Sequence, residues 1–215
     1  MILQNARAFF IATALCLAAA APGYCYADAK AGEALAKKGA GSAAPCMQCH
    51  GANGEGQAAA GFPRLAGQNQ AYLVKQMQDF STGRRSNPIM QAFARTLSVQ
   101  QIRDVAEYYA SLPAWQASKP VALTAAAARG SQLARKGNWD KGIPACFACH
   151  GEQGVGIAPS FPALAGQNAN YMSKQLSAWR AGARTNDPQG LMRSVAEKMS
   201  PDEITAVSAY FENPQ

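Results

Sequence analysis

Two five-residue stretches, Cys46-Met47-Gln48-Cys49-His50 and Cys146-Phe147-Ala148-Cys149-His150, share the pattern Cys-x-x-Cys-His and lie 100 positions apart. In each stretch two spacer residues separate the thiols, so both thiols lie on neighbouring corners of one helical turn. A histidine follows directly and is carried on the same turn. The chain contains 2 histidines, and both belong to these stretches. We therefore expect the fold to be built around two copies of this pattern.

The pattern is typical of the covalent attachment of c-type haem. Its two thiols can form thioether bonds with the two vinyl groups of one porphyrin, and the imidazole can bind the iron from one side. We therefore expect two covalently bound haem c groups. The predicted attachment residues are Cys46, Cys49, Cys146 and Cys149, and the predicted iron ligands on this side are His50 and His150.

The sequence around each motif is repeated, which predicts two copies of one structural unit. Residues 30–39 (KAGEALAKKG) match residues 128–137 (ARGSQLARKG), and FPRLAGQN at 62–69 matches FPALAGQN at 161–168. Between the copies, Pro113 and Pro120 enclose a polar stretch that is typical of a linker. The predicted organisation is a signal peptide at 1–27, an N-terminal domain at 28–113, a linker at 114–123 and a C-terminal domain at 124–215.

Hydrophobic residues recur at helical spacing, and no stretch alternates convincingly with period two, so we expect an all-α fold without a sheet. Helices are predicted near residues 28–38 and 124–136, and further helices after two asparagine N-caps and two capping boxes. The signals are Gly39 and Gly137 as helix ends, Asn69 and Asn168 as N-caps of helices to about Phe80 and Trp179, and capping boxes at Ser200-Glu203 and, more weakly, Ser98-Gln101.

Each repeated unit has only about 90 residues, and the apolar core of so small a unit is marginal by itself. A covalently held porphyrin adds apolar surface to that core. We therefore expect the haem-free protein to be poorly folded.

The iron position opposite each histidine needs a separate ligand. The chain has no third histidine, so methionine is the next candidate. The repeat pairs Met90 with Met192, whereas it pairs Met77, Met172 and Met199 with leucines, which indicates core packing for these three. We therefore predict that Met90 and Met192 are the second iron ligands, and packing in the core is the alternative for both.

Arg85 and Arg184 also match between the copies and lie in polar loops before these methionines. Two roles stay open for them, pairing with haem propionates or exposure in a solvated loop. Extra residues in the second copy make the loop before Met192 longer than the loop before Met90, which can tune the second haem differently.

The first residues predict an export signal. Arg7 precedes an apolar run at residues 8–21, and small residues precede a cleavage point after Ala27. The run is shorter than the ~20 apolar residues that a membrane span needs, so an uncleaved anchor is the less favoured alternative. We therefore expect a periplasmic protein, whose mature chain has all of its cysteines in the two motifs, and we leave a peripheral membrane association open.

The formal net charge of +7 raises the question of nucleic-acid binding. Basic residues are spread along the chain and no nucleic-acid motif is recognisable, so we predict no nucleic-acid partner. A mildly basic surface is better suited to docking onto acidic redox proteins.

These features together resemble the cytochrome c4 family of dihaem c-type cytochromes over essentially the whole mature chain. The resemblance rests on both Cys-x-x-Cys-His motifs, both Phe-Pro-x-Leu-Ala-Gly-Gln stretches and both Met-x-x-x-Ala-x-x-(Leu/Met)-Ser stretches. It implies two tandem cytochrome c-like domains related by a pseudo-two-fold axis, with the haems near each other at the interface. Its further implications are that Pro63 and Pro162 offer carbonyls to His50 and His150, and that Gly32 and Gly130 lie where the first helix of each domain crosses the last, against Tyr108 or Tyr109 and Tyr210 or Phe211.

With both axial positions filled, the irons have no site for a substrate, so we expect an electron carrier and not an enzyme. The predicted route runs from a quinol–cytochrome c reductase to a terminal oxidase. The alternatives are an electron-transfer subunit of a periplasmic dehydrogenase and a dihaem peroxidase-like enzyme, which would need one iron without its methionine. A zinc-binding module is disfavoured because the two cysteine pairs of a zinc ribbon lie much closer together in the sequence than the pairs in this chain do. A thioredoxin-like redox pair is disfavoured because the sequence predicts none of the strands that it needs.

Overall fold

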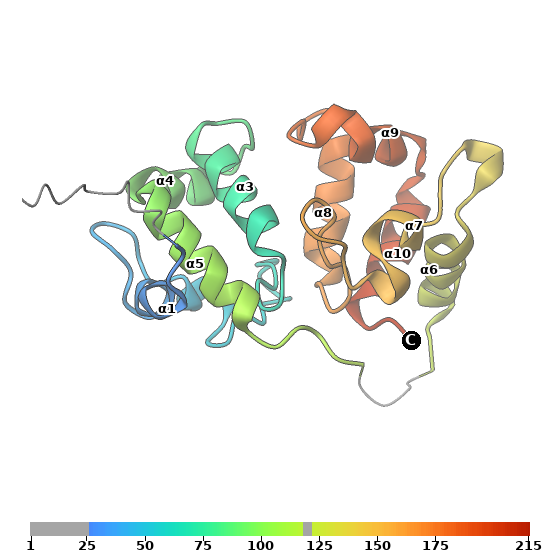
Figure 1. Cartoon of the computed structure of the whole chain (residues 1–215). Helices are drawn as coiled ribbons and strands as arrows, with labels where there is room; N and C mark the ends of the chain where they lie inside the picture. The colour runs from blue at the N-terminus through green and yellow to red at the C-terminus, as the bar shows by residue number, and fades with distance from the viewer. Residues whose placement is uncertain (1–25, 118–121) are drawn as a thin grey trace, which may run out of the picture.

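The computed structural model describes residues 26–117 and 122–215. Nearly all of the predicted signal peptide and residues 118–121 of the predicted linker lie outside the described residues. Within them the chain forms α-helices, short 3₁₀ turns and isolated β-bridges but no named strand (Figure 1), which confirms the all-α prediction. No helix in this described part is both long enough and apolar enough to span a bilayer.

The N-terminal unit is drawn in blue to green in Figure 1. Its helices are α1 (Ala29–Lys38), α2 (Met47–His50), α3 (Gln70–Ser81), α4 (Pro88–Thr96) and α5 (Val99–Ser111). The C-terminal unit repeats this order in yellow to red. Its elements are α6 (Ala125–Lys136), η1 (Trp139–Lys141), α7 (Phe147–His150), η2 (Glu152–Gly154), α8 (Ala169–Arg180), η3 (Pro188–Gly190), α9 (Leu191–Lys198) and α10 (Pro201–Glu212).

The helix starts follow the capping signals in the sequence. The Asn69 side chain accepts a hydrogen bond from the Tyr72 amide, and that of Asn168 accepts one from the Tyr171 amide, so both predicted N-caps are confirmed. Both predicted capping boxes are confirmed, because the two hydrogen bonds of the box form at Ser98 as well as at Ser200. An amide and a carboxylate at the third helical position reach the N-cap amide equally well.

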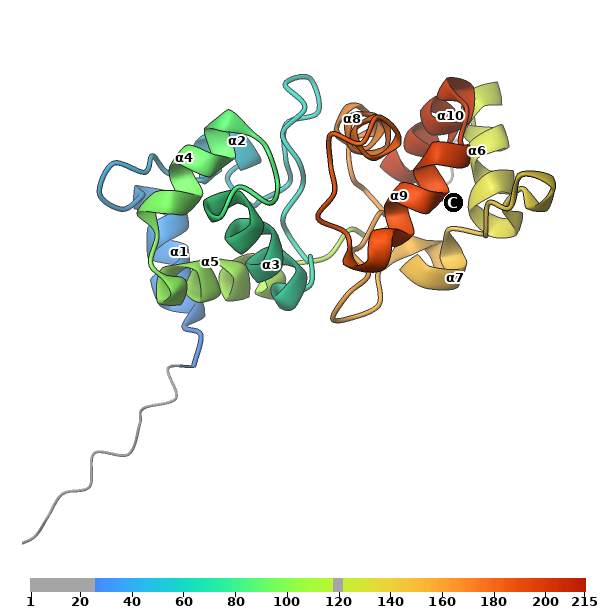
Figure 2. The same ribbon diagram turned by 90° about the horizontal axis from the view of Figure 1, so that it is seen from above.

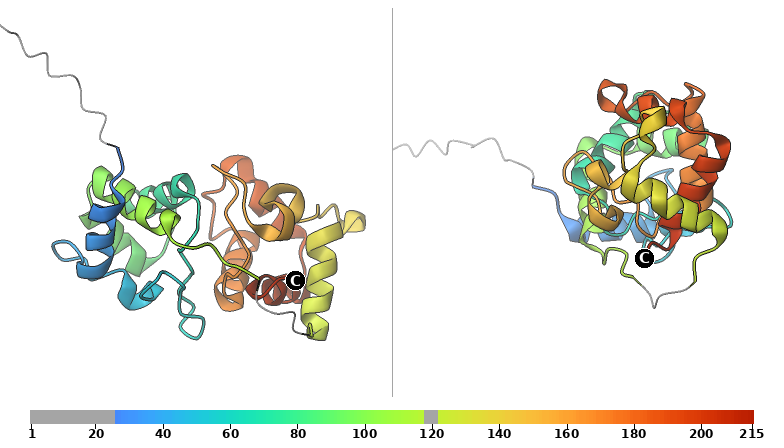
Figure 3. Two further views of the ribbon diagram at one scale, coloured as in Figure 1. Left: turned by 60° about the horizontal axis from the view of Figure 1, so that its bottom comes forward. Right: turned by 90° about the vertical axis from the view of Figure 1, so that its right-hand side faces the viewer.

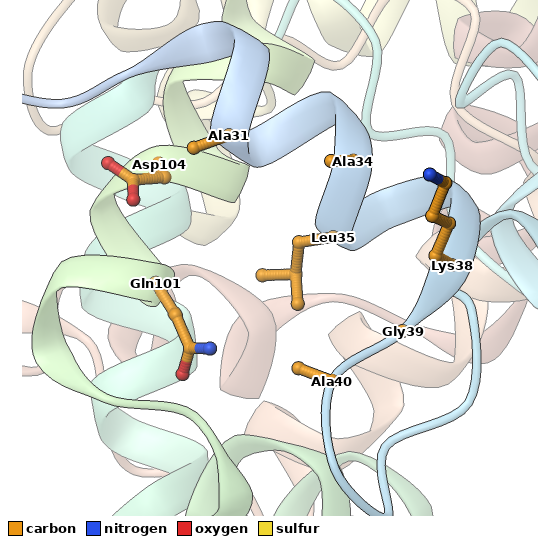
Figure 4. A pocket seen from close by; sticks show the side chains of 8 residues that line it. All are labelled: Ala31, Ala34, Leu35, Lys38, Gly39, Ala40, Gln101 and Asp104. Atoms are coloured by element: carbon orange, nitrogen blue, oxygen red, sulfur yellow. The ribbon is translucent and has the colours of Figure 1, made fainter.

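The first and last helices of each unit cross at a glycine. A Cβ on Gly32 would overlap the Asp104 carbonyl oxygen and lie 2.9 Å from the Tyr108 Cβ, and a Cβ on Gly130 would meet Ala206 and Tyr210 in the same way. The crossing implied by the resemblance is therefore present. Beside it, Ala31 and Leu35 of α1 and Gln101 and Asp104 of α5 line a shallow groove (Figure 4), which contains none of the predicted haem residues.

The two units lie side by side, with α3 and α8 toward the centre and α1 and α6 toward the outer ends (Figures 2 and 3). The chain between them packs on both units, since a Cβ on Gly67 would overlap Ala114 and one on Gly166 would overlap the Trp115 ring. Absence of a side chain at these matching glycines lets the connection lie close to each unit. Each glycine also has a positive φ of 70°, which a residue with a Cβ rarely adopts.

Each unit has its own apolar core. The N-terminal core includes Leu73, Val105 and Tyr109, and the C-terminal core includes Met172, Met199, Ile204, Val207, Tyr210 and Phe211. Met172 is 7% exposed and Met199 is 4% exposed, which confirms their predicted packing role. The first cysteine of each motif, Cys46 or Cys146, packs against the edge of the core in its unit. The attachment motifs are thus continuous with the cores.

Candidate haem sites

Each Cys-x-x-Cys-His motif forms a single helical turn. The His50 amide donates to the Cys46 carbonyl oxygen at 2.9 Å, and His150 makes the same bond to Cys146 at 2.9 Å. These bonds place the second thiol and the imidazole of each motif on α2 or α7, with the first cysteine as the N-cap residue of that helix. No disulfide joins the four cysteines of the motifs, so each sulfur is available for a thioether bond. The sequence therefore brings together the three groups that each predicted attachment requires.

A backbone carbonyl orients each histidine ring. His50 Nδ1 lies 3.0 Å from the Pro63 oxygen, and His150 Nδ1 lies 2.8 Å from the Pro162 oxygen. Because a carbonyl oxygen only accepts, each Nδ1 must carry the proton and donate it. The opposite nitrogen, Nε2, then has a free lone pair. Both hydrogen bonds that the resemblance implies are therefore present.

The surroundings of these rings fit a haem. His150 Nε2 is buried and has no hydrogen-bond partner among the described residues, so its lone pair is available to a metal ion. Burial lowers the pKa of both imidazoles, although the bonds to the proline carbonyls oppose that shift, so the neutral form is favoured. The neutral imidazole with an unpaired Nε2 is the form that binds iron.

The predicted methionines lie on other helices than the histidines. Met90 is in the first turn of α4, where its amide donates to the Asn87 Oδ1 at 2.9 Å. Met192 is in the first turn of α9 and follows the 3₁₀ turn η3, which lies in the longer loop of the second copy. Both side chains are half-buried. Their role as second iron ligands stays a prediction.

The two matching arginines are buried at the interface between the units, with Arg85 6% exposed and Arg184 5% exposed. Of the two roles left open by the sequence, exposure in a solvated loop is therefore excluded for both arginines. The loops fold inward because each guanidinium finds hydrogen-bond acceptors on the α3 and α8 helices and an aromatic ring beside it. Arg85 lies over Phe80 at 4.6 Å, and Arg184 lies over Trp179 at 3.9 Å.

The acceptors of these guanidinium groups are shared across the interface. Arg85 donates to Gln76 of its own unit at 2.9 Å and to Gln175 of the other unit at 2.7 Å. Arg184 donates to Gln175 at 2.9 Å and reaches across to Gln76 at 3.1 Å. Arg85 also donates to the Tyr171 hydroxyl at 2.8 Å. Gln76 and Gln175 were not singled out from the sequence alone. Their matching positions in the two copies were the feature of the sequence that could have indicated a shared role.

Comparison with known proteins shows which family has this architecture. The family model for cytochrome c matches residues 29–113 and 127–214. The cytochrome c4 of Pseudomonas aeruginosa is 43% identical over 86% of this chain and 88% of its own. The chain belongs to the cytochrome c4 family. A crystal structure of reduced recombinant cytochrome c4 from Pseudomonas stutzeri superposes with a TM-score of 0.77 at 39% identity, covering 87% of this chain and 98% of that one.

Proteins that are described by thiosulfate dehydrogenase rather than by cytochrome c4 are at least as similar to this chain in sequence identity. A "thiosulfate dehydrogenase electron acceptor" from Stutzerimonas stutzeri is 49% identical over 80% of each chain. A thiosulfate dehydrogenase structure from Marichromatium purpuratum matches with a TM-score of 0.78 and 41% identity. That match covers 85% of this chain but 39% of the other, so this chain corresponds to part of a longer protein there.

Membership of the cytochrome c4 family establishes the cofactor and the general role. The chain binds two haem c groups covalently and is a dihaem electron carrier rather than an enzyme. Its partners are redox proteins. The two short helices with their N-cap cysteines, each holding a thiol pair and a carbonyl-bound histidine, are the parts of this chain that fit such a cofactor.

One carboxylate at the interface, Asp79, is expected to make the stability of the fold depend on pH. The Asp79 side chain is 2% exposed, pairs with Lys75, lies 2.9 Å from Arg84 Nε and accepts from Asn186 at 2.6 Å. Burial alone would raise the pKa of Asp79, but the hydrogen bonds from Lys75 and Asn186 and the charges of Lys75 and Arg84 outweigh it and hold the pKa below its usual range. The ionised form is therefore stabilised by folding.

We expect Asp79→Asn to lower the free energy of unfolding at neutral pH by about 1–3 kcal/mol, since it removes hydrogen bonds to a charged group. Because the folded pKa is depressed, the contribution of Asp79 is complete above its unfolded pKa of about 4 and is lost as the pH falls through the folded pKa. Denaturant unfolding measured from neutral pH to about pH 3 should show the two proteins converging. Asp140→Asn, at an exposed position, is the control, and a difference independent of pH would contradict the prediction.

Proposed function

We propose that this chain is a periplasmic electron relay in which each domain holds its haem through one Cys-x-x-Cys-His motif and one methionine. The attachment residues would be Cys46, Cys49, Cys146 and Cys149, and the axial iron ligands would be His50 with Met90 and His150 with Met192. When bound, each haem supplies an iron that takes up and releases one electron, and a thioether ligand raises its reduction potential relative to a second imidazole.

The observation that carries this proposal is the bond from each histidine Nδ1 to a proline carbonyl, at 3.0 Å for His50 and 2.8 Å for His150. It selects the tautomer with a free Nε2 and fixes the ring plane, so little reorganisation is needed when the charge of the site changes. Burial of both rings keeps water away from that nitrogen. These features suit electron transfer rather than substrate binding.

We further propose that Arg85 and Arg184 pair with haem propionates. Both guanidiniums are buried, and their hydrogen bonds go to neutral side chains, namely glutamine, asparagine and tyrosine. Asp79, the carboxylate nearby, is already paired with Lys75 and Arg84. A buried excess of positive charge is costly unless anions compensate it, and propionates would supply them.

Two classes of electron donor are supported by the similarity to known proteins. The relatives described as thiosulfate dehydrogenase electron acceptors are 49% and 46% identical to this chain, against 43% for the cytochrome c4 of Pseudomonas aeruginosa. We therefore propose a periplasmic dehydrogenase of the thiosulfate dehydrogenase type as the donor. A quinol–cytochrome c reductase is the second candidate, with a terminal oxidase as the acceptor for either, and the family resemblance supports it.

The two donors can be compared directly on the oxidised holoprotein by stopped-flow absorbance. One arm uses thiosulfate with a purified thiosulfate dehydrogenase, and the other uses quinol with a solubilised quinol–cytochrome c reductase. We expect both haems to be reduced faster in the first arm, and reactions without thiosulfate or without quinol are the controls. Faster reduction in the second arm would favour the respiratory route, and no reduction in either arm would contradict both.

A further inference from the structure

Two glutamine side chains cross between the units, and each pairs with both backbone groups of one residue on the other side. Gln68 Nε2 donates to the Ala163 carbonyl oxygen at 2.7 Å, and the Ala163 amide donates to Gln68 Oε1 at 3.1 Å. Gln167 Nε2 likewise donates to the Arg64 carbonyl oxygen at 3.0 Å, and the Arg64 amide donates to Gln167 Oε1 at 2.9 Å. Both glutamines are buried, at 6% and 5% exposure. The two contacts are related by the internal repeat.

The backbone group that each glutamine holds belongs to the peptide that orients a histidine. The Ala163 N–H and the Pro162 C=O are the two ends of one planar peptide group. That N–H donates to Gln68, and that C=O accepts from His150 Nδ1 at 2.8 Å. The chain of hydrogen bonds therefore runs from Gln68 in one unit through a rigid peptide to His150 in the other.

The same connection exists in the opposite direction. The Arg64 amide donates to Gln167 Oε1, and the Pro63 carbonyl of the same peptide accepts from His50 Nδ1 at 3.0 Å. Hydrogen bonds in such a chain polarise one another, so a peptide whose N–H is bonded has a more negative carbonyl oxygen. A more negative oxygen binds the imidazole proton more strongly and makes Nε2 a better electron donor.

We propose that Gln68 and Gln167 are positioning residues that couple the two haem sites, each controlling the axial histidine of the opposite domain. The inference rests on the proposed ligation by His50 and His150. Loss of Gln68 would weaken the bond from His150 to Pro162, reduce electron donation by His150 and raise the reduction potential of the C-terminal haem. Loss of Gln167 would act on the N-terminal haem through His50.

We expect the effect of Gln68 on His150 to be larger than the effect of Gln167 on His50, because the Pro63–Arg64 peptide of the N-terminal unit has additional hydrogen bonds around it. Asn168 of the other unit donates to the Phe62 carbonyl oxygen at 2.8 Å. The Arg64 side chain donates to the Pro113 carbonyl oxygen at 2.7 Å, whereas the matching residue Ala163 has no side chain that could do so. The segment that holds Pro63 therefore keeps supports when Gln167 is removed, and we expect Gln68 to have the larger effect.

The experiment uses reduced holoprotein labelled with ¹⁵N-histidine, because the chain contains 2 histidines and both are at issue. The wild type should give two protected Nδ1–H signals, assigned through the backbone of the two motifs. In Gln68→Leu the His150 signal should move upfield and exchange faster with solvent while the His50 signal stays unchanged. Gln167→Leu should give the reverse pattern with a smaller shift. Redox titration of the same samples should show one potential raised in each variant.

The reciprocal variant is the matched control, because Gln68 and Gln167 are both buried glutamines at the interface but bond different histidine-bearing peptides. If general loosening of the interface caused the effect, each variant would shift both histidine signals. A pair of unchanged signals in Gln68→Leu and Gln167→Leu would overturn the inference. If the wild type lacked signals typical of metal-bound imidazole, the proposed ligation by His50 and His150 would be contradicted instead. Failure of the coupling and failure of the ligation therefore give different results.

Discussion

Met192→Ala is expected to open the C-terminal haem to carbon monoxide while the N-terminal haem stays closed. Removal of the proposed thioether ligand would leave that iron with an open position, to which one carbon monoxide per chain would bind in the reduced protein. Met90→Ala should do the same at the N-terminal haem, and the double variant should bind two. Each single variant should also lose about half of the weak red absorption band of iron(III)–methionine ligation and lower one reduction potential.

Met172→Leu is the control for these variants, because Met172 is a buried core residue that the repeat pairs with Leu73. It should leave both haems closed to carbon monoxide. Spectroscopic titration of the reduced proteins with carbon monoxide measures the stoichiometry. Stoichiometric binding by the wild type, or no binding by either single variant, would show that Met90 and Met192 are not the ligands.

Removal of one attachment site is expected to unfold one domain. Cys46→Ala/Cys49→Ala leaves the N-terminal unit without a covalently bound porphyrin, and a unit of about 90 residues has little apolar surface to replace it. We expect the loss of roughly half of the far-ultraviolet helical signal, because the two units contain comparable helices. The remaining domain should keep one haem per chain and its own unfolding transition.

The reciprocal variant, Cys146→Ala/Cys149→Ala, is the control for this result and should unfold the C-terminal unit instead. Circular dichroism and haem content measured on the same samples separate loss of folding from loss of haem. A variant with one haem, full helical signal and a single unchanged transition would contradict the expected dependence of folding on haem. Unfolding of one unit also removes the glutamine that supports the histidine of the other unit. We therefore expect the hydrogen bond between that histidine and its proline carbonyl to weaken.

The sequence by itself determined the local parts of this protein. Each Cys-x-x-Cys-His motif spans one helical turn, and the caps at Asn69, Asn168, Ser98 and Ser200 depend on residues within three positions. Such contacts follow from helical geometry alone, so motif and spacing are enough to predict them. The internal repeat added the pairing of Met90 with Met192, which no single copy would have shown.

The tertiary structure alone decided what lies between the two copies. Arg85 and Arg184 sit in polar loops and were open to a solvated role, yet both are buried, because glutamines on facing helices supply their acceptors. Gln68 and Gln167 match in the repeat, but nothing in the sequence shows that each holds a peptide about 95 to 103 positions away. Periodicity describes contacts within a helix, whereas contacts across an interface depend on how two finished domains are placed against each other.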